Sequence, residues 1–230
     1  MATLARERPR LEPFAGIYTA SDAALYLEIT MPETSALSVD AAKIRRWIRK
    51  GVADPAWRGA PVGNVLIDFE DLVSMRVIAA LRSVDVSWPA IRKAEAWLRE
   101  QTGARKPFAT ASLWHDAGDV YSEWSQQLIA ASRHGQVAFD LLRDYIIPVH
   151  GLEFDDETKH AKWWEPKREI RLNPKIQFGS PCIAGTRVPT SVVYDSAMAG
   201  DPKESMVDDY GVTMEQVEAA LDWEYRIRAD

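Results

Sequence analysis

The chain has 230 residues, of which 47% are hydrophobic, enough for one large core or two small ones. Its formal net charge of −6 argues against a protein that coats nucleic acid through bulk positive charge, although a local basic face remains possible. The single cysteine excludes an internal disulfide framework, and no stretch approaches the roughly 20 apolar residues of a membrane-spanning helix. We therefore expect a cytoplasmic protein without membrane contact.

A first short helix is predicted over residues 18–27. Thr19 is a suitable N-cap, and Asp22 places an acid in the first turn. The residues Ala23, Tyr26 and Leu27 recur on one side and predict the buried face of this helix.

A second helix is predicted over residues 39–50, with apolar and cationic side chains on opposite sides. Its cationic side contains no acid after Asp40 and carries Lys43, Arg45, Arg46, Arg49 and Lys50. The helix follows the first one at the spacing of a helix-turn-helix, so these cations are candidate contacts to phosphates or base edges in a major groove. The alternative is an ordinary solvated face.

Residues 51–63 are rich in Gly and Pro, contain Arg58, and precede the strand pattern Val65-Leu66-Ile67. This pattern predicts a β-hairpin wing, with Arg58 as a further DNA contact beside Thr19. The order of helix, turn, tryptophan-bearing basic helix and wing resembles the MerR-like winged helix-turn-helix group over residues 18–82. The resemblance implies DNA binding by this part of the chain.

The middle of the chain alternates helical and strand patterns. Asp68 caps a helix that is apolar nearly all round, and Ser87 caps another over residues 88–101. Hairpins are predicted over residues 109–124 and 152–164, with a helix over 136–147 between them. Residues 165–171 are predicted to form a linker, which places the domain boundary between residues 166 and 167.

Three short helical patterns follow in the stretch 173–225. Thr190 is the predicted cap of the first, Pro202 begins the second, and Thr213 with Gln216 forms a capping box for the third. Glycines end the first two. Helices this short bury little alone, so we expect them to share one core in a compact trihelical unit.

The extended lead to these helices contains Gly185-Thr186-Arg187, followed by Val-Pro-Thr. This stretch resembles a small domain of unknown function that occurs in antitoxins of bacterial toxin–antitoxin pairs. The resemblance makes Gly185, Thr186, Arg187 and Thr190 candidate contacts to a partner, to a second copy of the chain, or to DNA.

No pattern for catalysis is present. The four histidines lack metal-ligand spacing, and there is neither a phosphate-binding glycine loop nor a nucleophile elbow. We predict no enzyme activity, no metal and no other cofactor.

The whole arrangement resembles a VapB-type antitoxin. The expected fold is mainly α with small β hairpins (α+β), divided into a MerR-like domain over residues 1–166, which includes a helical and β-hairpin extension, and an antitoxin-type helix-turn-helix domain over 167–230. The resemblance implies a homodimer that binds operator DNA as an autorepressor and neutralises a cognate PIN-like ribonuclease toxin. One alternative is a one-component MerR-like transcriptional regulator whose Trp-rich middle senses a small molecule. Another is an interaction module that does not bind DNA.

Overall fold

The computed structural model describes residues 15–30, 38–50, 65–83, 85–111 and 151–229. These residues form α-helices and short antiparallel strands, which confirms the expected α+β class. The helices are α1 (Ala20–Thr30), α2 (Ala41–Arg49), α3 (Phe69–Ser83), α4 (Trp88–Thr102), α8 (Thr190–Ala199), α9 (Lys203–Tyr210) and α10 (Met214–Arg228), with 3₁₀ turns η1 (Pro107–Ala109) and η2 (Gln177–Gly179). The strands are β1 (Tyr18–Thr19), β2 (Leu66–Ile67), β3 (Leu152–Phe154), β4 (Ala161–Lys167), β5 (Ile170–Leu172) and β6 (Pro181–Ile183).

The N-terminal helices begin at the predicted caps. The Asp22 amide donates to Thr19 Oγ1 at 3.1 Å, and the Thr19 amide donates to Asp22 Oδ2 at 2.7 Å, so the two residues cap α1 reciprocally. Ser87 accepts the Ala90 amide at the start of α4, and Gly103 ends that helix at φ 67°. These caps depend only on neighbouring residues, which is why the sequence predicts them.

The predicted wing strand has a different partner. β2 pairs antiparallel with β1, and Tyr18 lies opposite Ile67. The pairing buries both of these side chains, which are 2% and 1% exposed. The remainder of the predicted wing, including Arg58, lies outside the described residues.

A four-stranded antiparallel sheet in the order β3-β4-β5-β6 corrects the predicted linker. The hairpin of β3 and β4 is confirmed, but β4 continues to Lys167, and Ile170 begins β5. Residues 165–171 are therefore two strands and their turn. Ile170 and Leu172 are completely buried, and this burial stabilises the sheet on one face. The predicted domain boundary at 166/167 falls within β4.

The first predicted hairpin also begins differently. Residues Pro107–Ala109 form the turn η1, and Thr110 makes an isolated antiparallel bridge with His160. The rest of this hairpin and the predicted helix over 136–147 lie outside the described residues.

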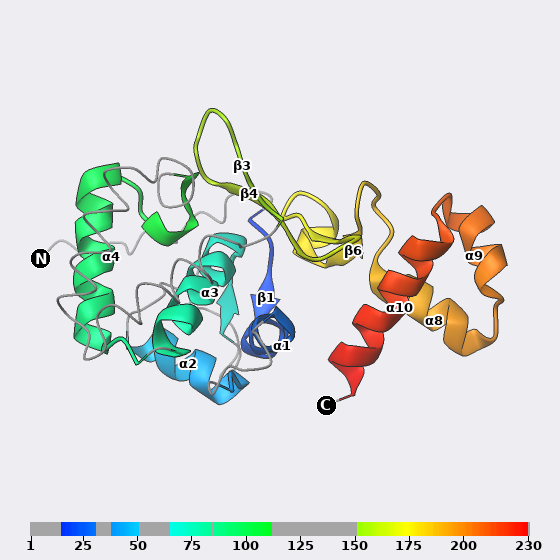
Figure 1. Ribbon diagram of the computed structural model, residues 1–230, viewed down its shortest axis with the longest axis horizontal. Coiled ribbons are helices and arrows are strands. Elements are labelled where there is room, and N and C mark those ends of the chain that lie inside the picture. Colours follow the sequence, from blue (N-terminus) through cyan, green and yellow to red (C-terminus); the bar gives the residue numbers. More distant parts are fainter. Residues whose placement is uncertain (1–14, 31–37, 51–64, 84, 112–150, 230) are drawn as a thin grey trace, which may run out of the picture.

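The C-terminal helices α8, α9 and α10 form the expected trihelical unit, and Figure 1 shows the sheet between them and the group α2, α3 and α4. The capping box of Thr213 and Gln216 is confirmed. Thr190 is not a cap, because α8 has Pro189 at that position and begins with Thr190 itself. The helical spacing of Val217, Leu221 and Tyr225 predicts Tyr225 on the apolar side of α10. In the structure Tyr225 is 50% exposed, whereas Trp223 is completely buried.

Trp223 is buried because α10 packs against α1. Its ring lies 5.7 Å from that of Tyr26, measured between centroids. The Tyr18 hydroxyl also donates to the Gly179 carbonyl at 3.0 Å. One cluster of buried apolar residues therefore extends from the N-terminal helices to the C-terminal unit. None of the described helices is long and apolar enough to cross a membrane.

Candidate nucleic-acid interface and C-terminal motif

Helix α2 presents its arginines to solvent. Ile44, Trp47 and Ile48 are buried against the neighbouring helices, which turns the opposite side of α2 outward. That side carries the exposed residues Arg45, Arg46, Arg49 and Lys50. None of the three arginines forms an ion pair with another described residue. Their charge is therefore available to an anion such as a phosphate group.

Trp88 extends this surface beyond α2. Lys50 Nζ lies 5.2 Å from the centre of the Trp88 ring, and Arg82 Cζ lies 5.4 Å from it. The same ring contacts Trp47 edge-on, with 5.8 Å between centroids. Trp88 thus contacts one cation from the C-cap of α2 and one from the end of α3. The sequence pattern gives Trp88 and Arg82 no such role, because the contacts join three separate helices.

The other predicted DNA contacts have mixed positions. Lys43 is half-buried, and its ammonium group donates to the Ser38 carbonyl before α2. Thr19 is exposed at the start of α1, where its side chain also serves as the cap. Arg58 lies outside the described residues, so its predicted role stays a prediction.

The Gly-Thr-Arg motif forms a tight turn after β6. Gly185 has φ 77°, a left-handed conformation that glycine adopts readily. Thr186 Oγ1 donates to the Ile183 carbonyl at 2.9 Å and accepts the Val188 amide at 3.0 Å. Gly185 and Thr186 thus shape the turn, and Arg187 is exposed on it.

Thr190 has an internal position. It is 1% exposed, and its hydroxyl lies 2.5 Å from Glu224 Oε1 and 3.3 Å from the Pro181 carbonyl. These contacts join α8 to α10 and to β6. Figure 1 shows β6 and α2 in different parts of the molecule, so the residues of the C-terminal motif and the cations of α2 are not brought together.

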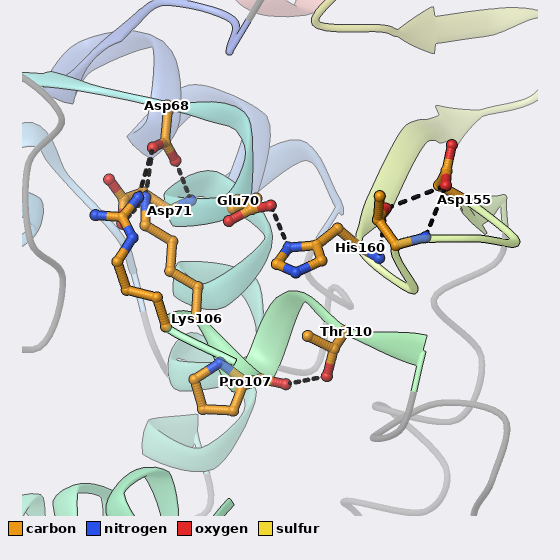
Figure 2. Close-up of polar contacts among 10 residues, drawn as sticks. Asp68, Glu70, Asp71, Lys106, Pro107, Thr110, Asp155 and His160 are labelled. Carbon is orange, nitrogen blue, oxygen red and sulfur yellow. Dashed lines mark hydrogen bonds and ion pairs between the residues drawn. The ribbon is translucent and has the colours of Figure 1, made fainter. Parts of the chain in front are cut away.

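A buried ionic cluster holds the segment before η1 against α3. Lys106 Nζ lies 2.5 Å from Asp68 Oδ2 and 2.9 Å from Asp71 Oδ1. Figure 2 shows the three side chains together. Burial raises the pKa of Asp71 to about 7; the charge of Asp68 adds to this effect, and the contacts with Lys106 oppose it.

The same region ties the β3–β4 hairpin to α3. His160 Nδ1 lies 2.6 Å from Glu70 Oε1, and Figure 2 shows these side chains pointing toward each other. These contacts hold the segment before η1 and the β3–β4 hairpin against α3, which is a structural role. No group of three or more His, Cys, Asp or Glu side chains within the described ranges is placed to hold a metal ion.

Cys182 is a buried side chain of β6 rather than a nucleophile. Burial raises the pKa of its thiol to about 11, and the nearby Arg187 only partly opposes this. The thiol is therefore protonated at neutral pH, whereas nucleophilic chemistry requires the thiolate.

Three comparisons show which known proteins this chain is similar to. Residues 170–223 match a family described as "Protein of unknown function (DUF433)". Over 90% of its length the chain is 25% identical to the protein named "Putative antitoxin VapB45" of Mycobacterium tuberculosis (strain ATCC 25618 / H37Rv), and 92% of that protein is covered. The chain resembles an antitoxin. This similarity runs along nearly the whole length of both proteins.

The fold is also found in a solved structure. The crystal structure of Rv2018 from Mycobacterium tuberculosis is similar with a TM-score of 0.67 at 22% identity. The similarity covers 92% of this chain and 98% of that one, so the fold as a whole is shared.

Proposed function

We propose that this chain is the antitoxin of a type II toxin–antitoxin pair, which represses its own operator and neutralises a cognate PIN-like ribonuclease toxin. The observation that carries the DNA-binding part is the exposed arginine face of α2 in a chain whose net charge is −6. The antitoxin part is supported by the 25% identity to an antitoxin-type relative over 90% of the chain.

DNA binding is assigned to the MerR-like arrangement of α1 and α2. Helix α1 packs against α2 and supports it from behind, while Arg45, Arg46 and Arg49 face outward. In a homodimer, two copies of α2 enter successive major grooves about 34 Å apart. The cations around Trp88 then lie at the border of the same surface and contact phosphates. Occupation of the operator blocks transcription.

Toxin binding is assigned to the C-terminal unit. Its described acids outnumber its bases and include Asp195, Asp201, Glu204, Asp208, Asp209, Glu215, Glu218 and Asp222. A ribonuclease attracts RNA phosphates and therefore carries a basic surface, to which an acidic unit is complementary. Binding that covers the active site of the toxin removes its activity by occlusion.

The DNA-binding proposal is tested by fluorescence anisotropy with DNA from just upstream of the gene, against scrambled DNA, over a salt series. The variant Arg45→Ala plus Arg46→Ala is expected to lower the salt slope by about two, because each arginine is assigned one phosphate. The control Arg168→Ala plus Lys203→Ala makes the same change in net charge at exposed sites on other elements. An unchanged slope in the α2 variant would reject α2 as the recognition helix.

The antitoxin proposal is tested by co-expression with the protein encoded beside it. We expect a complex of fixed stoichiometry that survives gel filtration. A regulator that senses a small molecule would instead purify alone, and its operator affinity would change with that molecule.

A further inference from the structure

The turn η2 holds Phe178 in an unusual backbone conformation. Gln177, Phe178 and Gly179 have φ values of 47°, 54° and 90°, so three consecutive residues are left-handed. Only glycine adopts this conformation without steric cost, because the Cβ atom of a residue such as phenylalanine comes too close to the following carbonyl oxygen. The Phe178 side chain is nevertheless 73% exposed.

The backbone of the turn has a clear structural role. The Ile17 amide donates to the Phe178 carbonyl at 2.9 Å, and the Tyr18 hydroxyl donates to the Gly179 carbonyl at 3.0 Å. A Cβ atom on Gly179 would lie 2.3 Å from the Tyr18 hydroxyl, so glycine is required there. The turn thus fastens the C-terminal unit to the strand β1.

None of these contacts requires a phenylalanine at position 178. The backbone carbonyl makes the hydrogen bond, and the exposed ring contributes little to the core. An asparagine would adopt the same φ with less strain and would expose no apolar ring. Strain combined with an exposed aromatic ring is understandable when the ring is used outside the monomer.

The surroundings of Phe178 indicate what it contacts. Ile17, joined to it by the backbone hydrogen bond, is 47% exposed. Gln177 Nε2 donates to the Arg187 carbonyl at 3.3 Å, which places Arg187 beside the turn. The Arg187 side chain is exposed and forms no ion pair with another described residue. We call Ile17, Phe178 and Arg187 the Phe178 surface.

We infer that the Phe178 surface is an anchor for a partner protein that offers an apolar pocket with carboxylates at its rim. An aromatic side chain beside an arginine is the composition typical of binding hot spots. The positive charge of Arg187 selects the acidic rim, and the two apolar side chains select the pocket, whereas the acidic helices of the C-terminal unit face the basic surface elsewhere on the toxin. This inference rests on the proposed function for the identity of the partner, which is the toxin.

The test uses the full chain and the purified protein encoded by the neighbouring gene. Phe178→Asn is expected to weaken binding at least about thirtyfold, the loss typical of a hot-spot residue. Its Tm is expected to stay the same or rise, because the strained turn accepts asparagine. A fall in Tm would show that the ring is packed within the chain, and it would overturn the inference.

Two control variants give the result its specificity. Met198→Gln removes a 56% exposed apolar side chain from the regular helix α8, and we expect it to bind as the wild type does. Asp208→Asn plus Asp209→Asn reduces the acidity of α9, which the proposed function directs at the basic surface of the toxin, so its effect on binding should diminish at high salt. Loss of binding in Met198→Gln, with Phe178→Asn binding normally, places the contact on the helices and overturns the inference.

The remaining outcomes separate this inference from the proposed function. If wild type and Phe178→Asn bind the neighbouring protein equally, the antitoxin proposal stands and the Phe178 surface is not the anchor. If the wild type does not bind that protein, both fail. If instead a wild-type dimer dissociates in Phe178→Asn, as sedimentation would report, a second copy covers the surface and the inference is overturned.

Discussion

Lys106 is 6% exposed, and its single positive charge faces the carboxylates of both Asp68 and Asp71. Two buried acids thus share one buried cation, and the largely exposed Arg105 reaches only Asp68, at 3.9 Å. Asp71 therefore has no cation of its own among the described residues. The protein meets this cost by retaining a proton on Asp71, whose pKa is raised to about 7 mainly by burial.

This proton makes stability depend on pH. An unfolded aspartate has a pKa of about 3.9, so between about pH 4 and 7 the folded chain holds a proton that the unfolded chain has lost. The contribution of Asp71 to stability is therefore present at low pH and lost as pH rises towards 7. Between pH 5 and pH 7, we expect the free energy of unfolding of the wild type, measured with urea, to fall. In Asp71→Asn this fall should be smaller by up to about 2–3 kcal/mol.

A variant at an exposed acid provides the control for this measurement. Asp156→Asn, in the turn after β3, is expected to follow the wild-type pH profile. Parallel profiles for wild type and Asp71→Asn would contradict the assignment of the proton to Asp71.

Individual helices depend on short-range signals, and the sequence predicts these well. At the start of α10 the Gln216 amide donates to Thr213 Oγ1 at 3.2 Å, and the Thr213 amide donates to Gln216 Oε1 at 3.1 Å. The two residues are three positions apart, so the capping box can be predicted from the sequence alone. The same holds for the caps at Thr19 and Ser87.

Removal of this cap gives an element-scale prediction. Thr213→Ala is expected to lower the free energy of unfolding by about 0.5–2 kcal/mol, because the Gln216 amide loses its acceptor. Thr213→Ser retains the hydroxyl and should stay within about 0.5 kcal/mol of wild type in the same denaturant titration. Equal stability of the alanine and serine variants would show that the hydrogen bonds of the box contribute nothing.

Strand pairing and interior contacts are harder to predict, because their partners are distant in sequence. The pattern at Val65-Leu66-Ile67 identifies a strand but cannot reveal that β1 is its partner. Residues 165–171 contain proline and charged residues typical of a linker, yet the burial of Ile170 and Leu172 makes them part of a sheet. In the candidate DNA site, the cations of α2 are predictable from helical spacing. The contribution of Trp88 is not, because it comes from another helix.

Across the whole molecule, the aromatic contact between Tyr26 and Trp223 joins the first helix to the last. Their ring centroids are 5.7 Å apart, although almost the whole chain separates the two residues in sequence. Helical spacing predicts Tyr225, and not Trp223, on the apolar side of α10. The tertiary contact with α1 overrides that pattern.

A double-mutant cycle measures this connection. Tyr26→Leu and Trp223→Leu should each destabilise the chain, and their effects should be coupled by about 0.5–1.5 kcal/mol, as expected for an aromatic pair. The comparison cycle pairs Tyr26→Leu with Tyr225→Leu, a half-exposed ring that contacts Tyr194 instead. Additive losses in the Tyr26–Trp223 cycle would show that the two rings merely lie near each other.

The position of β5 between β4 and β6 affects what can be cut out of this chain. The recurrent family stretch begins at Ile170, the first residue of β5. A fragment starting there would keep the three C-terminal helices, but one side of β5 would have no neighbouring strand. Unpaired strand edges promote aggregation or exchange between molecules. The unit that recurs in other proteins is therefore smaller than the unit that folds here. A fragment that pairs both sides of β5 needs the preceding hairpin from Leu152 onward.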